Sequence, residues 1–199
     1  QIARVVNTPG FIAGDFHVHS IDSPDCEVTR AERVGTQLAE GMDFFTPSDH
    51  DYRSDFGPTI AAVGVSSLIS TAVSAEITTF DYGHFNSWPV TRNPLALNGG
   101  GVDWGRALVA PGADFPSLGN YGLTPAEIIF AAHGDPLNNL VQINHVASFF
   151  GKDGLDIDTA EGGTGPPTSH ATAASRRLDP LVPNFFTSTF DALEIWIGT

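Results

Sequence analysis

The sequence predicts an α/β domain with a largely parallel sheet or barrel, because predicted strands alternate with predicted helices along its 199 residues. Apolar residues make up 41% of the chain, which is enough for a hydrophobic core, and no change in composition indicates a second domain. The notable polar residues follow predicted strands, and functional sites in such folds gather at the carboxyl ends of strands. We therefore expect one domain over residues 1–199.

The first predicted elements are a strand, a helix and a second strand. An apolar strand over 11–19 leads into a polar loop. Thr29 and Glu32 form a capping box that begins a helix, and Gly41 ends it. The short apolar segment 43–46 is then the second predicted strand.

The middle of the chain predicts one helix and two strands. The helix covers roughly 59–69, and the β-branched segment 70–80, which contains Glu76, is a strand. Residues 83–90 are expected to pair with that strand as a hairpin.

Long loops separate the remaining elements. Residues 91–123 and 147–183 are rich in Gly and Pro and are expected to be insertions. Between them, Thr124 and Glu127 form a second capping box with Pro125 at the first helical position. The elements predicted after that box are a helix to about residue 132, a buried strand over 140–146 and a last strand over 191–197.

The composition excludes some classes of partner. The formal net charge is −14, and a chain with only nine Lys and Arg offers no basic surface for a nucleic-acid backbone. No apolar run approaches the roughly 20 residues that a membrane span requires. Cys26 is the one cysteine, which excludes an internal disulfide and a cysteine-rich zinc site. The compartment stays open.

His17 and His19 are the first candidate metal ligands. On a strand, residues i and i+2 point to the same face, so both imidazoles can reach one ion. The alternative is a pair of histidines on a solvent-facing strand edge. Asp15, Asp22 and Asp25 nearby favour a metal site, since carboxylate and imidazole together suit Zn, Mn or Fe.

Five further candidates lie near later strands. Asp49 and His50 follow an apolar strand, although either Asp49 or Asp51 alone would suit a turn. Glu76 lies in an apolar strand, where burial is costly unless the carboxylate is paired or binds metal; the alternative is an exposed edge strand. His84 and His145 taken singly are more typical of hydrogen-bonded core residues. Together these positions favour metal binding.

This ordered set of motifs resembles the PHP (polymerase and histidinol phosphatase) metallohydrolases. The matching segments are Asp15-Phe16-His17-Val18-His19-Ser20, Ser48-Asp49-His50, Glu76, Gly83-His84-Phe85-Asn86 and Asn144-His145. The segments from Gly83 to Asn86 and from Asp191 to Trp196 are similar to the branch that includes carbaryl hydrolase. The resemblance runs from about residue 11 to residue 197.

The resemblance implies a distorted (β/α)7 barrel that holds two or three divalent ions, Zn, Mn or Fe, at its strand ends. Glu76 matches the carboxylate that bridges two ions, and Asp49 is expected to orient His50 without binding metal itself. The residues that match family ligands are His17, His19, Asp25, His50, Glu76, His84 and His145.

The resemblance also implies a C-terminal part beyond this chain. Family members have an Asp-x-His pair just after the strand that 191–197 resembles, and the sequence ends at Thr199. We therefore expect the C-terminal part of the barrel to be missing from this chain, and the cleaved segment of the same protein is a possible partner. The first residue, Gln1, is likewise expected to result from processing or trimming.

The function expected is metal-dependent hydrolysis by a metal-activated water acting on a phosphoester or on a carboxylic or carbamate ester. Glu76, Asp49 and His50 are the expected catalytic residues. Arg53, Asn86 and His170 are expected to contact the small-molecule substrate.

The alternatives are a non-catalytic metal- or anion-binding module and an inactive proteolytic fragment of the hydrolase. The acidic composition disfavours a DNA-processing PHP domain. His133 is expected to have a structural role at the end of a helix.

Overall fold

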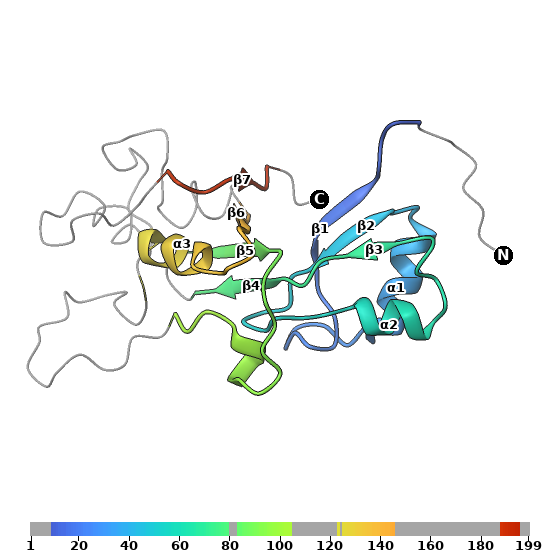
Figure 1. The fold of residues 1–199 in the computed structure, drawn as a ribbon, viewed down its shortest axis with the longest axis horizontal. Helices are drawn as coiled ribbons and strands as arrows, with labels where there is room; N and C mark the ends of the chain where they lie inside the picture. Colours follow the sequence, from blue (N-terminus) through green and yellow to red (C-terminus); the bar gives the residue numbers. More distant parts are fainter. Residues whose placement is uncertain (1–8, 80–82, 105–122, 124, 146–187, 196–199) are drawn as a thin grey trace, which may run out of the picture. The chain divides into compact units, whose positions relative to one another are not determined.

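The computed structural model describes residues 9–79, 83–104, 123, 125–145 and 188–195. By its contacts the chain divides into two compact units (Figure 1). The first contains Gln1–Glu76 and Trp88–Gly101, and the second contains Ile77–Ser87 and Val102–Thr199. The expectation of one domain over the whole chain stays a prediction.

The first unit is a parallel three-stranded sheet with two helices on one of its sides (Figure 1). Both strand pairings in this sheet are parallel, and the strand order is β1-β2-β3. The elements are β1 (Gly14–Val18), α1 (Arg30–Ala39), β2 (Phe44–Pro47), α2 (Gly57–Ala62) and β3 (Ser70–Thr71).

A single apolar cluster joins the sheet to its helices. Val18 of β1 and Phe45 of β2 pack with Val34 of α1 and Ile60 of α2, and all four are buried. Phe45 also meets Phe56 edge to face, with ring centroids 5.2 Å apart. Because the apolar side chains of β1 and β2 are fixed in this cluster, the loops that follow both strands start from well-defined positions.

Helix α1 begins where the capping box predicts. The Thr29 side chain accepts a hydrogen bond from the Glu32 backbone, and the Glu32 side chain accepts one from the Thr29 backbone. The hydrogen bonds from Thr29 lower the pKa of the Glu32 carboxyl. The helix ends before Gly41, whose φ of 78° is left-handed.

Helix α2 is shorter and earlier than the predicted 59–69. It starts at Gly57 with Pro58 in its first turn, and its C-cap is Val63. Gly64 has a φ of 75°, which ends the helix there. The prediction of a helix to residue 69 did not take Gly64 as the end of the helix.

The predicted strand over 70–80 is interrupted, which corrects the expectation of one continuous element. β3 ends at Thr71, and β4 (Ala75–Thr78) begins four residues later. Between them, Ser74 forms an antiparallel bridge with Ser54 and exchanges backbone hydrogen bonds with it. The Ser74 hydroxyl also donates to the Pro47 carbonyl. This pairing takes the chain out of the parallel ladder before it reaches Glu76.

The second unit is built on a sheet with the strand order β4-β5-β6-β7, in which β6 and β7 are parallel. Helix α3 packs against it through Ile128, Ile129 and Ala132, which are buried against Val141 and Ile143 of β6. The elements after β4 are β5 (His84–Trp88), α3 (Pro125–His133), β6 (Leu140–Ile143) and β7 (Ala192–Leu193).

The last two predicted strands are shorter in the structure than in the sequence pattern. β6 stops at Ile143, before Asn144 and His145, and β7 has two residues. A short 3-10 turn, η1 (Leu97–Gly100), lies inside the predicted insertion 91–123. Thr124 and residues 147–183 lie outside the described residues, so the second capping box and the second insertion stay predictions.

The described residues therefore confirm a mixed α/β fold with parallel strands. Their strands form a three-stranded and a four-stranded sheet, and no closed barrel is present among them. The (β/α)7 barrel stays a prediction. None of the described helices has the length and apolar character needed to cross a membrane.

Candidate metal centre

Five of the seven predicted ligands lie in the first unit. His17 is in β1, His19 follows it and His50 follows β2, so these three lie near the carboxyl ends of parallel strands, as the sequence predicts. Asp25 lies in the loop between β1 and α1, and Glu76 is the second residue of β4, near its amino end. The roles of all five as metal ligands stay predictions.

Strand pairing brings these positions together. β1 has an irregular register opposite β2 between Asp15 and Val18, which is where His17 lies. Such bulges redirect a side chain next to many functional sites. His50 and Glu76 form an isolated parallel bridge, with the Asp51 amide donating to the Glu76 carbonyl and the Glu76 amide donating to the Asp49 carbonyl.

Glu76 is the centre of the group. Its side chain is fully buried, and its carboxylate oxygens lie 3.4 Å from His17 Nε2, 3.6 Å from His19 Nε2 and 2.9 Å from His50 Nδ1. The Nε2 atoms of His17 and His19 are 3.1 Å apart. Burial excludes the alternative of Glu76 on an exposed edge strand.

Asp25 extends the group on its solvent side. Its Oδ2 lies 3.2 Å from His50 Nε2, and its side chain is 58% exposed. The imidazole of His50 therefore stands between a buried carboxylate and an exposed one. In this unit the ligand atoms of two trios, His17 with His19 and Glu76, and His19 with Asp25 and His50, lie within 4.8 Å of one another.

This donor set fits a divalent transition metal. Three imidazole nitrogens and two carboxylates are the ligands that Zn, Mn and Fe take in proteins, at distances near 2.0–2.2 Å for Zn. An ion at the centre of the trio of His17, His19 and Glu76 would also compensate the buried charge of Glu76. The residues therefore match the metal dependence that the sequence predicts.

The same contacts shift the protonation of the imidazoles in opposite directions. The hydrogen bond with Glu76, against the effect of burial, raises the pKa of His50 to about 9. Burial lowers the pKa of His19 to about 4, although Glu76 opposes the shift. Burial tends to raise the pKa of Asp25, but His50 and His19 together hold it below its usual value.

Asp49 has a different role from the one expected. We predicted that its carboxylate orients His50; instead it accepts hydrogen bonds from the Ser20 amide at 2.6 Å, from the Ser20 hydroxyl at 2.9 Å and from the Ser54 hydroxyl. Asp49 is fully buried. Burial raises its pKa, and the hydrogen bonds from Ser54 and Ser20 oppose the shift. It therefore ties the loop after β1 to the loop after β2.

Two cations that the sequence analysis overlooked support the loop between β1 and α1. Arg33 of α1 donates to the His19 carbonyl at 2.8 Å, and Arg30 donates to Asp22 at 2.6 Å. Both arginines lie on the first turn of the helix that the capping box begins. The sequence gives only a weak signal for these two roles, which is that both arginines lie in the predicted helix close to a polar loop.

Ser23 is the other overlooked residue. Its hydroxyl lies 3.0 Å from His19 Nδ1 and 2.9 Å from the His50 amide nitrogen, and it is 3% exposed. The only signal for it in the sequence is its position between two predicted ligands, four residues after His19 and two before Asp25.

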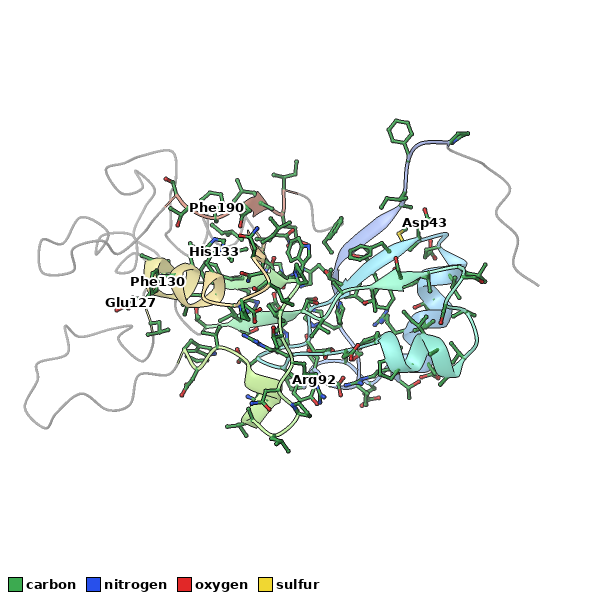
Figure 2. All side chains as sticks on the ribbon, viewed as in Figure 1. Asp43, Arg92, Glu127, Phe130, His133 and Phe190 are labelled. Atoms are coloured by element: carbon green, nitrogen blue, oxygen red, sulfur yellow. The ribbon has the colours of Figure 1, made fainter. Side chains whose placement is uncertain are left out.

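The predicted substrate contact Arg53 lies in a braced segment of the first unit. Its amide donates to the Asn98 carbonyl at 3.0 Å, and its guanidinium donates to the Thr91 carbonyl. Arg92, labelled in Figure 2, donates to the Arg53 carbonyl and to the Tyr52 hydroxyl. These bonds fix the chain just after His50, and the substrate contact stays a prediction.

The predicted ligands His84 and His145 lie in the second unit. Their rings meet edge to face with centroids 5.1 Å apart. His84 begins β5, and His145 follows β6 with a left-handed φ of 50°. The His145 amide donates to the Glu194 carboxylate at 2.8 Å. That His84 and His145 bind the same ions as the candidate ligands of the first unit stays a prediction.

Two further predictions concern polar residues of the second unit. Asn86 is 1% exposed, and its amide oxygen accepts a hydrogen bond from Asn144 at 2.9 Å, so at least one of its polar atoms stabilises the sheet. His133, near Phe190 in Figure 2, ends α3, and its Nε2 lies 3.0 Å from the Thr189 carbonyl and 3.5 Å from Asp191. These contacts agree with a structural role for His133. His170 lies outside the described residues.

The chain is similar to known proteins in structure and not in sequence. No protein-family model matches the sequence, and no curated protein does. A solved two-domain protein from Bacteroides vulgatus, which contains a predicted PHP-like metal-dependent phosphoesterase, aligns with a TM-score of 0.47 and 21% identity. The alignment covers 86% of this chain and 44% of that one, so this chain spans less than half of its length. At this TM-score and identity the match assigns neither family nor function.

Proposed function

We propose that the chain is a metal-dependent hydrolase that acts on an ester with a metal-activated water. The observation that supports this most directly is the carboxylate of Glu76, fully buried and within 3.6 Å of three imidazole nitrogens. A buried carboxylate among imidazoles is costly in an apolar setting unless a cation compensates it. The resemblance of the sequence motifs to PHP metallohydrolases favours the same function.

We assign the five residues of the first unit to two neighbouring ions. In the carboxylate of Glu76, Oε1 lies near His17 Nε2, and Oε2 lies near His19 Nε2 and His50 Nδ1. A carboxylate in that position suits a bridging ligand. His84 and His145 would complete the set as the resemblance implies, and the total of two or three ions is part of the proposal.

Bound divalent ions lower the pKa of a water from about 15.7 toward about 7 and polarise the substrate's phosphoryl or carbonyl oxygen. The protein's own residues supply the setting. Burial keeps the imidazole of His19 neutral, so that it presents a lone pair. Asp25, the most exposed acid of the group, is the one that reaches solvent and incoming substrate. No Ser or Cys nucleophile is needed.

The charge of the chain favours a small substrate of low negative charge. A net charge of −14 repels polyanions. Among the described residues, Arg53 and Arg92 are the cations in the segments that brace the loop after His50. Carboxylic esters, carbamates and small phosphoesters fit this setting better than nucleic acids. The choice among these three classes is the finer part of the proposal.

The test compares Glu76→Gln with the wild type. Gln has the shape of Glu without its charge, so this variant should lose bound metal and lower metal-dependent hydrolysis about 100-fold or more, since even the loss of a residue that only supports a ligand costs about 10–100-fold. Glu27→Gln, at an exposed position, is the matched control. Metal per chain is measured by elemental analysis, and activity is measured on p-nitrophenyl acetate, a p-nitrophenyl carbamate and p-nitrophenyl phosphate with added Zn or Mn.

Two outcomes would contradict the proposal. A wild-type chain that neither contains nor takes up metal would favour the alternative of a non-catalytic or inactive form. Full metal-dependent activity in the Glu76→Gln variant would show that Glu76 is not a ligand.

A further inference from the structure

Ser23 joins two loops that carry candidate ligands. Its hydroxyl oxygen lies 3.0 Å from Nδ1 of His19, which follows β1, and 2.9 Å from the amide nitrogen of His50, which follows β2. Ser23 is 3% exposed, and its own amide donates to the Ser20 carbonyl at 2.9 Å. The hydroxyl is therefore held in the turn that leads to Asp25.

The two contacts have a defined direction if His19 binds metal. The amide of His50 can only donate, so the Ser23 oxygen accepts from it. His19 Nε2 faces His17 and Glu76, and a ligand nitrogen must offer a lone pair. A neutral imidazole then carries its proton on Nδ1 and donates it to Ser23. One hydroxyl oxygen accepts both bonds with its two lone pairs.

We propose that Ser23 is a positioning residue of the metal centre: it fixes the tautomer and ring orientation of His19 and holds the loop of His50 at a constant distance from it. The proposal rests on the proposed function of the site. A hydrogen-bond acceptor on the second ring nitrogen is what metal-binding histidines commonly need, and its loss typically costs 10–100-fold in metal affinity. Asp49 ties the same two loops through Ser20, but it reaches neither imidazole in its hydrogen bonds.

The experiment compares Ser23→Ala with Ser23→Thr in the full chain. Removal of the hydroxyl should weaken zinc binding about 10–100-fold, measured by competition with a chelator, and the Thr variant should restore most of the affinity. Ser70→Ala is the matched control, because it removes a hydroxyl whose contact is the Asp43 carbonyl. Urea unfolding of each metal-free variant separates a loss of affinity from a loss of fold.

A second measurement observes the tautomer of His19 directly. In the zinc-loaded protein, ¹⁵N NMR of the imidazoles should show His19 protonated on Nδ1 in the wild type and in the Thr variant. In the Ala variant, the proton should move partly to Nε2, a change that a general packing defect would not produce.

The outcomes separate this inference from the proposed function. Zinc affinity and a His19 tautomer that are both unchanged in Ser23→Ala would overturn the role of Ser23 while leaving the metal centre intact. A wild-type chain that binds no zinc would overturn the metal centre itself.

Discussion

The chemistry of single residues at this site follows from where carboxylates are buried. Glu76 and Asp49 are both fully buried, but their surroundings differ. Glu76 faces imidazole nitrogens, which can share a cation with it, whereas Asp49 faces hydroxyl and amide donors. The first arrangement suits a metal ligand, and the second suits a structural connection between loops. Two acids that the sequence analysis placed together in the candidate site thus have distinct surroundings.

The role of Asp49 predicts a loss of stability on substitution. Asp49→Asn replaces one acceptor oxygen with an NH₂ group, which cannot accept the bonds from Ser20 and Ser54 and leaves buried donors without partners. We expect the metal-free protein to lose about 1–3 kcal/mol in its free energy of unfolding, measured in urea. Glu27→Gln, an exposed change of the same kind, should leave stability within about 0.5 kcal/mol. Equal stability of the two variants would mean that the loops are held by other contacts.

At the scale of elements, local signals were predictable and long-range pairings were not. The capping box at Thr29 and Glu32 and the apolar run of β2 are encoded within a few residues, so both elements were predicted nearly to their bounds. The break at Ser74 was not predictable, because it depends on a partner 20 residues away, Ser54. The bonds of Ser23 depend on a turn that the sequence pattern does not specify.

The same distinction applies to the site. Residue types and spacing pointed to His17, His19, His50 and Glu76 as candidate ligands, and the resemblance to a known family added Asp25. Their supports were missed because Arg30 and Arg33 act through the geometry of α1 on a loop. For Asp49, its position next to His50 in the chain suggested a contact with that imidazole, whereas its carboxylate accepts hydrogen bonds from Ser20 and Ser54.

The loop that ends at Gly101 braces the segment after His50. We therefore expect alanine at Gly101 and alanine at Gly35 to change stability in opposite directions. A Cβ on Gly101 would lie 2.8 Å from the Asp51 carbonyl, which is backbone and cannot rotate away. Gly101→Ala should therefore destabilise the protein by about 1–3 kcal/mol through overpacking. Gly35, inside α1, has no atom within 4 Å of an added Cβ, so Gly35→Ala should stabilise it by about 0.5–1 kcal/mol.

Urea unfolding of the two variants in parallel is the measurement. Both changes add one methyl group, so differences in composition cancel. A neutral Gly101→Ala would show that the loop at 97–101 moves freely relative to Asp51. Destabilisation by Gly35→Ala would contradict the helix assignment over 30–39.

At the scale of the whole chain, the net charge of −14 and the metal centre both involve electrostatic repulsion, but over different ranges. Surface charges repel one another through water, and salt screens that repulsion within about 10 Å at 0.1 M ionic strength. The carboxylate of Glu76 lies in the interior, where mobile salt ions do not reach it and where the neighbouring His50 imidazolium or a bound metal ion compensates its charge. General screening and specific metal binding should therefore stabilise the protein independently.

Urea unfolding with added KCl or added zinc distinguishes the two effects. KCl should raise the free energy of unfolding of the wild type and of Glu76→Gln alike, because both chains carry nearly the same net charge. Zinc at about 1,000 times the dissociation constant of the wild type should stabilise the wild type by about 4 kcal/mol, since the ion binds the folded site. For Glu76→Gln, a loss of affinity of about 100-fold or more limits the gain to about 1.4 kcal/mol or less. EDTA should reverse the gain of the wild type. Equal stabilisation of both variants by zinc would show that the ion acts on the acidic surface, and the ligands of the first unit would then not form a metal centre.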